Sequence, residues 1–138
     1  YIVWGTGEQI RNWTYVSDIV EGTIRAAERI EDGTAVNLGT MERTSVIQCA
    51  KTVLERTGLD ATIQQDLTKP TGPYNRVADN SLAKELLDWE PEVSFSDGLD
   101  RTIRWYFDTN SQDEVAQDFE ISLTERGYEG GKKSAAAS

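Results

Sequence analysis

The clearest repeat of apolar positions lies between residues 19 and 30. Apolar side chains recur there at intervals of three or four residues, which is the spacing of one helix face. They are Ile19, Val20, Ile24, Ala27 and Ile30. Asp18 can cap the first turn, with Glu21 placed to bond back to the cap amide. The pattern predicts a helix that begins at Asp18 and ends before Asp32-Gly33, with a purely structural role for Asp18.

A second helical stripe follows Ser45 and reaches Leu54. Ser45 and Gln48 have the spacing of a capping box, and Gly58 suits the left-handed residue just past a helix end. Short apolar runs predict strands, of which the last is the weakest candidate. These runs are residues 1–4, 10–16, 35–38 and 61–65. Helices and strands alternate in short units, which favours an α/β or α+β arrangement.

Residues 66–76 are expected to form a loop, because Lys69-Pro70-Thr71-Gly72-Pro73 cannot continue a helix or a central strand. Leucines then predict a short helix that includes residues 82–87 and is capped near Asp79 or Ser81. A longer helix is predicted from about residue 96 to residue 108. From Ser111 onward the pattern fits a helix or a strand, and we favour a helix, with a disordered end over residues 130–138.

The charge balance excludes several kinds of partner. The chain of 138 residues carries 24 acidic and 14 basic residues, a formal net charge of −10, without a clustered basic face. Nucleic-acid binding requires such a face, because it neutralises phosphates. No stretch is apolar enough for a membrane span. We interpret the scattered acidity as a solvated surface rather than a site for a cationic partner.

The residue inventory also narrows the possible site chemistry. Histidine is absent and Cys49 is the single cysteine, which excludes histidine-based triads and histidine-ligated metals and makes any metal site a poor hypothesis. No internal disulfide can form. The residues from Tyr1 onward lack a secretory signal pattern, so we expect a cytoplasmic protein. The length fits one small domain or a fragment of a larger one.

Two arginines on extended segments are candidates for binding phosphate. Arg11 follows the tight Gly5-Thr6-Gly7 turn, and Arg76 follows the Pro-Gly-Pro loop. A guanidinium group presents a fixed fork of donors that can grip a phosphate at two points. From spacing alone, surface ion pairing is the more common role of an arginine, and both interpretations stay open.

The segment Trp4–Asp18 resembles the motif W/Y-G-x-G-x-Q-x-R-x-F/W-x-Y-V-x-D of the extended short-chain dehydrogenases. Further matching segments follow in the family's order. They are Val36–Gly39, Lys69–Pro73, Arg76–Asn80, Leu86–Pro91 and Gly98–Ile103. The resemblance covers about residues 1–107. Within the family, the chain resembles the NAD-dependent sugar-nucleotide epimerases and dehydratases, and is similar to the GDP-mannose 3,5-epimerase and UDP-glucose 4-epimerase branches. It implies an α/β fold, namely the C-terminal substrate-binding part of an extended short-chain dehydrogenase without the N-terminal Rossmann nucleotide-binding core.

The resemblance also implies a binding site for a nucleotide-diphosphate sugar. In the family, arginines at the positions of Arg11 and Arg76 bind the diphosphate, with the ligand held against a Rossmann domain. Gln9 and Asn80 are the other substrate-binding candidates by the same resemblance. The base and the sugar are left open, because UDP-, GDP- and dTDP-sugar enzymes share most of the pattern. Trp4 is a candidate to face the base, although packing at a strand is the more common role of such a residue.

The catalytic half expected of this family is not found in the sequence. The complete family enzyme uses NAD or NADP, seated on a Gly-rich turn, and a Tyr-x-x-x-Lys pair that moves a proton. Gly5-Thr6-Gly7 lacks a third glycine. Tyr128 and Lys132 match the spacing of the pair, but two adjacent glycines between them disfavour the helix that it needs. No catalytic residue and no bound cofactor are therefore expected on this chain alone.

Two hypotheses of different classes remain. The chain is either the sugar-nucleotide-binding portion of an epimerase or dehydratase, inactive without a Rossmann half, or a stand-alone non-catalytic module that binds a nucleotide sugar or a protein. Faces that pack on a Rossmann partner would be exposed, so we expect a homo-oligomer. Residues 1–110 are expected to form the substrate-binding portion and residues 111–138 a C-terminal extension.

Overall fold

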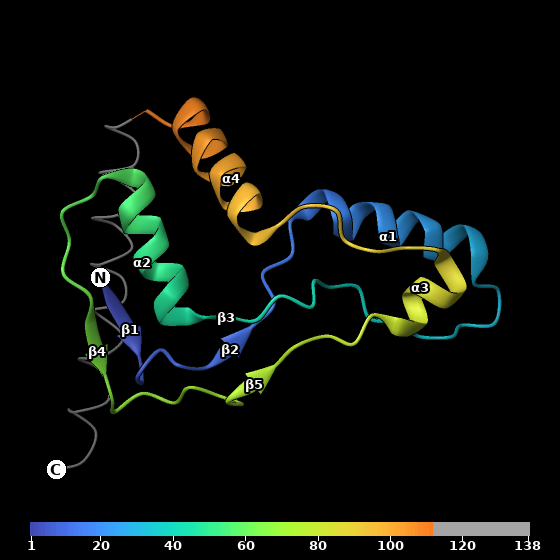
Figure 1. The fold of residues 1–138 in the computed structure, drawn as a ribbon, viewed down its shortest axis with the longest axis horizontal. Helices are drawn as coiled ribbons and strands as arrows, with labels where there is room; N and C mark the ends of the chain where they lie inside the picture. Colours follow the sequence, from blue (N-terminus) through green and yellow to red (C-terminus); the bar gives the residue numbers. More distant parts are fainter. Residues whose placement is uncertain (112–138) are drawn as a thin grey trace, which may run out of the picture. The chain divides into compact units, whose positions relative to one another are not determined.

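The computed structural model describes residues 1–111, and the chain divides into two units, Tyr1–Arg101 and Thr102–Ser138. The boundary falls inside the last described helix. Figure 1 labels the helices and strands along the chain. The elements in chain order are β1 (Ile2–Trp4), β2 (Ile10–Arg11), α1 (Val16–Arg29), β3 (Thr44–Ser45), α2 (Val46–Thr57), β4 (Gln64–Asp66), β5 (Asn75–Arg76), α3 (Ser81–Leu87) and α4 (Phe95–Thr109). The helix expected after Ser111, the disordered end and the Tyr128–Lys132 pair lie outside the described residues.

The strands form two small sheets. In the first, β1 and β4 are parallel, with Ile2 paired to Gln64. In the second, β2 lies between β3 and β5, antiparallel to β3 and parallel to β5. The Gly5 amide donates to the Asp66 carbonyl at 2.8 Å, so the turn that joins β1 to β2 is itself bonded to β4. Together with the helices, these sheets make an α/β fold.

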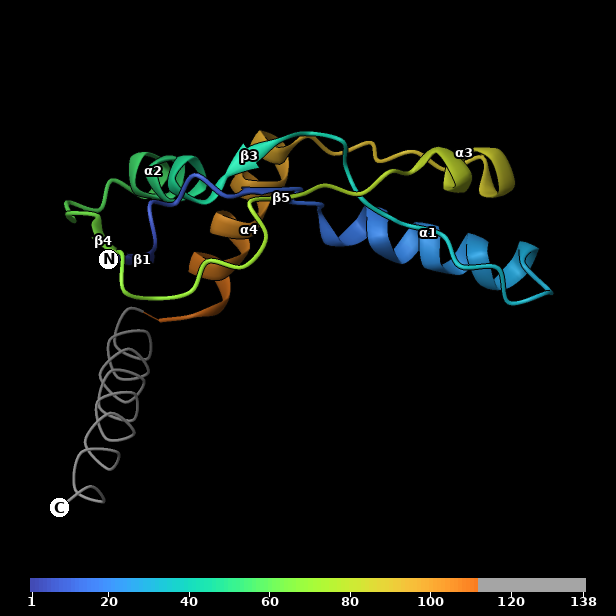
Figure 2. The same ribbon diagram turned by 90° about the horizontal axis from the view of Figure 1, so that it is seen from below.

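The hydrophobic core lies where α1 packs on α3 (Figure 2). Ala83 and Leu87 of α3 are fully buried, and Trp89 is 1% exposed. Each fully buried side chain of the size of leucine stabilises the fold by about 1.5–3 kcal/mol. Four partly buried residues pack against this cluster: Ala26, Ile30, Val36 and Leu38.

Arginines of α1 also bind the end of α3. Arg29 Nη1 donates to the carbonyl of Leu87 at 2.6 Å, and Arg25 Nη1 donates to the carbonyl of Asp88. The last carbonyls of a helix have no partner within the helix. The two arginines supply such partners, so α1 and α3 are joined by polar contacts as well as by the core.

Asp18 has a structural role, but the cap predicted from the sequence is wrong. Helix α1 begins at Val16, and its N-cap residue makes no side-chain capping bond. Asp18 is 6% exposed, and its Oδ2 accepts the amide of Val93 at 3.0 Å. Its carbonyl accepts the indole N–H of Trp89 at 3.0 Å. The buried carboxylate serves a tertiary contact, because it accepts a half-buried amide far along the chain.

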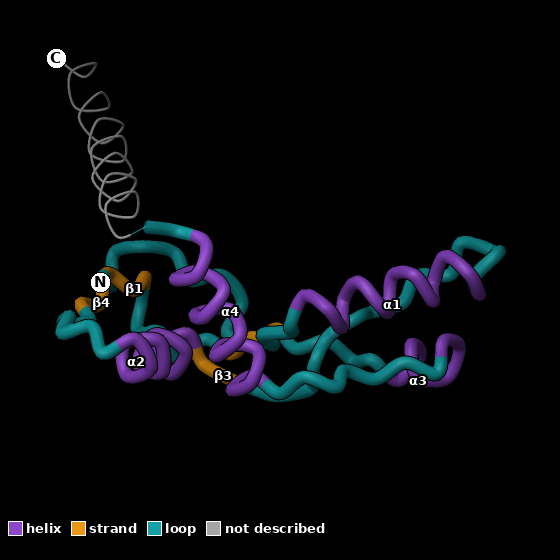
Figure 3. Tube along the Cα trace, turned by 90° about the horizontal axis from the view of Figure 1, so that it is seen from above, coloured by secondary structure: helices purple, strands orange, loops and turns teal. Residues whose placement is uncertain are grey.

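The strand predicted over residues 35–38 is wrong. The stretch between α1 and β3 is a loop up to Thr44 (Figure 3). Val36 and Leu38 pack on the core cluster, and the side chain of Asn37 donates to the carbonyl of Asp79 at 3.3 Å. Apolar character alone does not make a strand, because the ladder requires a neighbour that supplies backbone hydrogen bonds. No described strand lies in register with this segment.

Two other strand predictions are correct only in part. The run over residues 10–16 is a strand only at Ile10–Arg11, and α1 already begins at Val16. Between them, the hydroxyl of Thr14 accepts the amide of Thr40 at 2.9 Å. The strand predicted over residues 61–65 begins and ends later in the chain, because β4 spans Gln64–Asp66. The strand expected over residues 1–4 is confirmed by β1.

The helix ends were predicted more accurately. The hydroxyl of Ser45 accepts the amide of Gln48 at 3.1 Å, as expected for the start of α2. Gly58 adopts φ 67° at the end of α2, a left-handed conformation that glycine takes without steric cost. Asp79 Oδ1 accepts the amide of Ser81 at 2.9 Å at the start of α3. Within residues 1–111, no helix has the length and apolar character that a membrane span requires.

Candidate functional site

Strand pairing brings together the two arginines predicted from the sequence. β2 and β5 are parallel, and their register sets Ile10 against Asn75 and Arg11 against Arg76. Paired residues on neighbouring strands project to the same face of a sheet. The amide of Ile10 also donates to the carbonyl of Tyr74 at 2.8 Å, which fixes the entry to β5. The sheet therefore carries two permanent cations side by side.

The guanidinium group of Arg11 is already bonded to three carbonyl groups. Its Nη1 donates to Ile10 at 2.7 Å and to Pro73 at 2.9 Å, and its Nη2 donates to Thr71 at 3.3 Å. A guanidinium group has five N–H donors and stays protonated. Among the described residues, two of these donors have no acceptor. Arg11 can thus bind an anion while it holds the loop between β4 and β5.

Arg76 differs from Arg11 in its surroundings. It is exposed, and within residues 1–111 its side chain makes no hydrogen bond or ion pair. Another cation, Lys69, lies in the loop that precedes β5, with its Nζ 5.9 Å from the centroid of the Trp4 ring. Trp4 itself is 54% exposed, so it is not the core residue that its position on a strand suggested. The β2–β5 region thus carries three cations, Arg11, Arg76 and Lys69, on a chain whose net charge is −10.

Gln9 and Asn80, the other predicted site residues, are bonded within the protein. Gln9 is 8% exposed, and its Nε2 donates to the carbonyl of Trp4 at 3.3 Å. Asn80 is 7% exposed, and its Nδ2 donates to the carbonyl of Gly39 at 3.4 Å. No hydrogen bond joins either side chain to the two arginines among the described residues. A ligand-binding role for Gln9 and Asn80 stays a prediction.

The loop before β5 packs on the glycine turn before β2, a contact that the sequence did not indicate. A Cβ on Gly5 would lie 2.0 Å from Cγ2 of Thr71, so the threonine methyl group occupies the space that a side chain would need. The side chain of Gln65 also donates to the carbonyl of Thr6 at 2.7 Å. The sequence signal for it was the pair of glycines at positions 5 and 7. Glycines allow another segment to approach the backbone closely, but they do not indicate which segment does so.

Two carboxylates that flank this region are held by local turns. Thr68 donates its amide and hydroxyl to Asp66 Oδ1 at 3.0 and 2.6 Å, and these bonds, aided by the charge of Lys69, hold the pKa of Asp66 below its ordinary value. The amide and hydroxyl of Ser81 likewise lower the pKa of Asp79. Both groups are ionised at neutral pH. Neither is paired with a guanidinium group among the described residues.

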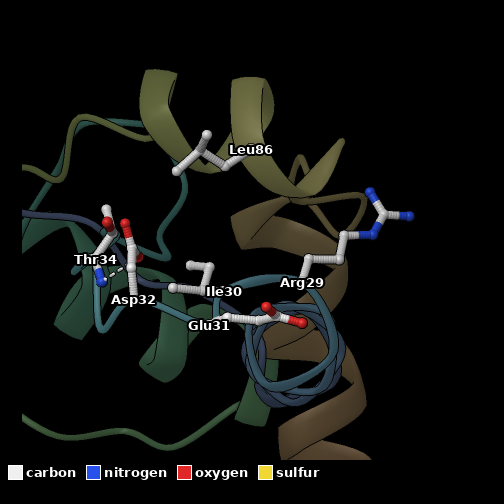
Figure 4. Close-up of a pocket in the computed structure, with 6 residues that line it drawn as sticks. All are labelled: Arg29, Ile30, Glu31, Asp32, Thr34 and Leu86. Carbon is white, nitrogen blue, oxygen red and sulfur yellow. Dashed lines mark hydrogen bonds between the residues drawn. The ribbon is translucent and has the colours of Figure 1, made fainter.

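Two surface hollows lie away from the arginine pair. One, of about 310 Å³, lies between the end of α1 and Leu86 of α3, and the amide of Thr34 donates to Asp32 at its edge (Figure 4). The other, of about 360 Å³, is lined by Asn37, Asp79, Ser81, Leu82 and Glu85. Within residues 1–111, no group of three or more histidine, cysteine, aspartate or glutamate side chains is arranged to hold a metal.

Comparison with protein families gives a match to the model described as GDP-mannose 4,6 dehydratase over residues 1–102. The chain is 32% identical over 105 residues to GDP-L-fucose synthase 1 of Arabidopsis thaliana, covering 76% of this chain and 32% of that protein. It is 38% identical over 101 residues to UDP-glucuronic acid decarboxylase 1 of the same plant, covering 73% of this chain and 23% of that protein. The chain thus spans about a quarter to a third of the length of these relatives.

Solved structures agree with this assignment. UDP-glucose 4-epimerase from Thermotoga maritima, solved with UDP-glucose, superposes with a TM-score of 0.72 at 33% identity, covering 78% of this chain and 35% of that one. UDP-glucuronic acid 4-epimerase from Bacillus cereus, solved with UDP-glucuronic acid and NAD, gives 0.64 at 34% identity, covering 71% of this chain and 32% of that one. The chain therefore belongs to the GDP-mannose 4,6-dehydratase family of extended short-chain dehydrogenases, which act as sugar-nucleotide epimerases and dehydratases.

Proposed function

We propose that this chain is the sugar-nucleotide-binding portion of an NAD(P)-dependent nucleotide-sugar epimerase or dehydratase, and that Arg11 and Arg76 bind the ligand's diphosphate. The observation that carries the proposal is the register of β2 and β5, which pairs the two arginines directly. The related epimerases from Thermotoga maritima and Bacillus cereus were solved with UDP-glucose and UDP-glucuronic acid, respectively. That chemistry suits a site built from neighbouring guanidinium groups.

The charges of the site match a diphosphate. Two phosphate groups carry several acceptor oxygens, and each guanidinium group can grip one of them at two points. The exposed Arg76 offers all its donors, and Arg11 offers two. A hydrogen bond to a charged group contributes about 1.5–3 kcal/mol. Loss of one arginine should therefore weaken binding by about tenfold to a hundredfold, since 1.4 kcal/mol is tenfold.

The glycine turn of this chain does not fit a dinucleotide. A Cβ on Gly5 would meet Thr71, and a Cβ on Gly7 would lie 2.8 Å from Cβ of Ile47 and 3.0 Å from Cγ1 of Val3. Protein atoms thus fill the space that a cofactor needs at a dinucleotide-binding turn. The turn leads into β2, whereas such a turn leads into a helix whose N-terminus faces the pyrophosphate. We expect the nicotinamide cofactor to bind another part of the complete enzyme, and we expect no turnover by residues 1–138 alone.

An apolar stripe on α1 fits a missing protein partner. Val16, Val20 and Ile24 are 65%, 51% and 49% exposed, and their spacing places them on one side of the helix. Such a stripe is covered in most folded proteins. We propose that it packs against the Rossmann part of the complete enzyme, and that the isolated chain associates with itself through it. Sedimentation should give an oligomer, and Val20→Glu should shift it toward monomer; a wild-type monomer would contradict self-association.

The binding proposal is tested by calorimetric titration of the chain with UDP-, GDP- and dTDP-sugars. We expect one of these classes to bind, with the diphosphate as the shared element. Arg76→Gln and Arg11→Gln should each weaken that binding by about tenfold to a hundredfold. Lys51→Gln removes the same charge from an exposed position on α2 and should leave the affinity close to that of the wild type.

Two results would contradict the proposal. The first is the absence of binding to all three ligand classes at millimolar concentration. The second is an equal loss of affinity in Lys51→Gln and Arg76→Gln, because that would indicate a general charge effect rather than a site. Binding of a nucleotide sugar without turnover in the presence of NAD supports the binding role, whereas turnover by the chain alone would overturn the view that the catalytic half is elsewhere.

A further inference from the structure

We infer that Arg11, besides its proposed contact with the diphosphate, fixes the Thr71–Pro73 loop and so holds Arg76 in register for phosphate. The inference rests on the proposed function, but its first consequence concerns the free protein. Arg11 donates to the carbonyls of Thr71 and Pro73. The family resemblance gave Arg11 and Arg76 the same role, whereas their surroundings in this structure differ.

The bonds of Arg11 lie immediately before the strand that carries Arg76. Pro73 is followed by Tyr74, whose carbonyl accepts the amide of Ile10 at 2.8 Å, and then by β5. β5 has only two residues, so it contributes few ladder bonds of its own. Its position depends on the residues that precede it. Arg11 therefore acts on Arg76 through a short and continuous stretch of backbone.

The loop has few other attachments. Thr71, Gly72 and Pro73 are exposed. The Thr71 methyl group lies over Gly5, and Arg11 Nη2 is 3.8 Å from the position that a Cβ on Gly72 would take. Gly72 adopts φ 68°, which directs the chain back toward β2. Removal of the Arg11 bonds would leave the loop held chiefly by one methyl contact and the backbone bond at Tyr74.

Arginine suits this role better than lysine. The carbonyls of Thr71 and Pro73 are separated by one residue, and a planar guanidinium group reaches both with two different nitrogen atoms. A lysine ammonium group is a single point charge on a flexible stem and lacks this fixed fork. Arg11→Lys thus keeps the positive charge but removes the planar fork that reaches both carbonyls. The variant therefore distinguishes the positioning of the loop from electrostatic attraction of the ligand.

The first test is amide hydrogen exchange in the ligand-free chain. Arg11→Lys should raise the exchange rate of the β5 amides, which take part in the ladder with β2, by about tenfold, because loss of a local bond worth about 1.4 kcal/mol opens this pairing tenfold more often. Arg76→Lys, on the paired strand, should leave that rate unchanged. Peptides from α1 serve as the internal reference for the folded state. Arg11→Met, which keeps an apolar stem without donors, should open the loop in the same way.

The second test is a double-mutant cycle on nucleotide binding, with UDP and GDP as the probes. If Arg11 acts in part through the placement of Arg76, Arg11→Lys should cost less affinity in the Arg76→Lys background than in the wild type. Additive losses would overturn the inference. Wild-type exchange of the β5 amides in Arg11→Lys would overturn it as well, because Arg11 would then not hold the strand. Loss of protection in α1 for both Arg11 variants would also overturn it, because the effect would then be global. Failure of the wild type to bind either probe would contradict the proposed function, while the exchange result would still decide whether Arg11 holds the loop.

Discussion

The contact between Gly5 and Thr71 gives a prediction with its own matched control. Gly5 has φ 70°, and a Cβ there would lie 2.0 Å from Cγ2 of Thr71 and 3.4 Å from its Cβ. Gly5→Ala therefore carries two costs. A left-handed conformation costs an L-residue about 1–2 kcal/mol. Overpacking costs about 1–3 kcal/mol in a packed core, and the lower end applies here because Thr71 is exposed and its methyl group can turn away. The sum, about 2–3 kcal/mol, is a sizeable share of the ~5–15 kcal/mol that stabilises a typical domain.

Gly33 separates the two costs. Its φ is 77°, and no atom lies within 4 Å of the position of its Cβ, so Gly33→Ala carries only the conformational cost of about 1–2 kcal/mol. Thr71→Ser removes the methyl group that Gly5→Ala would strike. The double variant Gly5→Ala/Thr71→Ser should thus recover about 1 kcal/mol relative to Gly5→Ala, and its remaining cost should approach that of Gly33→Ala.

The assay is urea unfolding followed by far-ultraviolet circular dichroism, with free energies from linear extrapolation. Equal destabilisation by Gly5→Ala and Gly33→Ala would refute the contact between the loop and the turn. Failure of Thr71→Ser to relieve Gly5→Ala would refute it as well. Confirmation would mean that the turn before Arg11 and the loop before Arg76 are held together by packing of Thr71 on Gly5 as well as by hydrogen bonds.

Three further predictions concern other parts of the chain. Asp18→Ala should destabilise the fold by about 1–3 kcal/mol in urea unfolding, because it removes the buried carboxylate that accepts the half-buried amide of Val93. Asp18→Asn should cost less, since its amide oxygen can accept. The pKa values of Asp66 and Asp79 are lowered below the ordinary 3.8, so both carboxylates stabilise the folded state at neutral pH. This stability is lost as the pH falls through the lowered pKa values, and the melting temperature should drop there. Asp66→Asn should make that drop smaller. Burial raises the pKa of the Cys49 thiol above its ordinary 9.0. Alkylation of Cys49 by iodoacetamide at neutral pH should therefore be slower than alkylation of a small-molecule thiol. An equal rate would contradict the burial of Cys49.

Helices were predictable from the sequence because their signals are local. The Ser45 cap and the Gly58 stop act within a few residues of the helix that they bound, and both are confirmed. Asp18 shows the limit of such signals, since its carboxylate is bonded to Val93. A local motif indicates which bonds a side chain can make, and the tertiary fold decides which of them it does make.

Strands were less predictable because their partners are distant in the chain. Residues 35–38 have a strand-like pattern but no ladder partner among the described residues, and Val36 and Leu38 pack on the core instead. The sequence indicated Arg11 and Arg76 as candidates for binding phosphate, and the family resemblance strengthened that prediction. The register of β2 and β5 supplies their geometry, and the contacts of Arg11 with its loop depend on the tertiary fold.

The central claim is that Arg11 and Arg76 together bind the diphosphate of a nucleotide sugar. The most direct measurement is nuclear magnetic resonance of the arginine Nε–H signals during titration with UDP-glucose, with the two signals assigned from the Arg11→Lys and Arg76→Lys variants. We predict that both signals shift together and saturate with one dissociation constant. Unchanged signals from both arginines at saturating ligand, with shifts confined to arginines elsewhere in the chain, would contradict the claim.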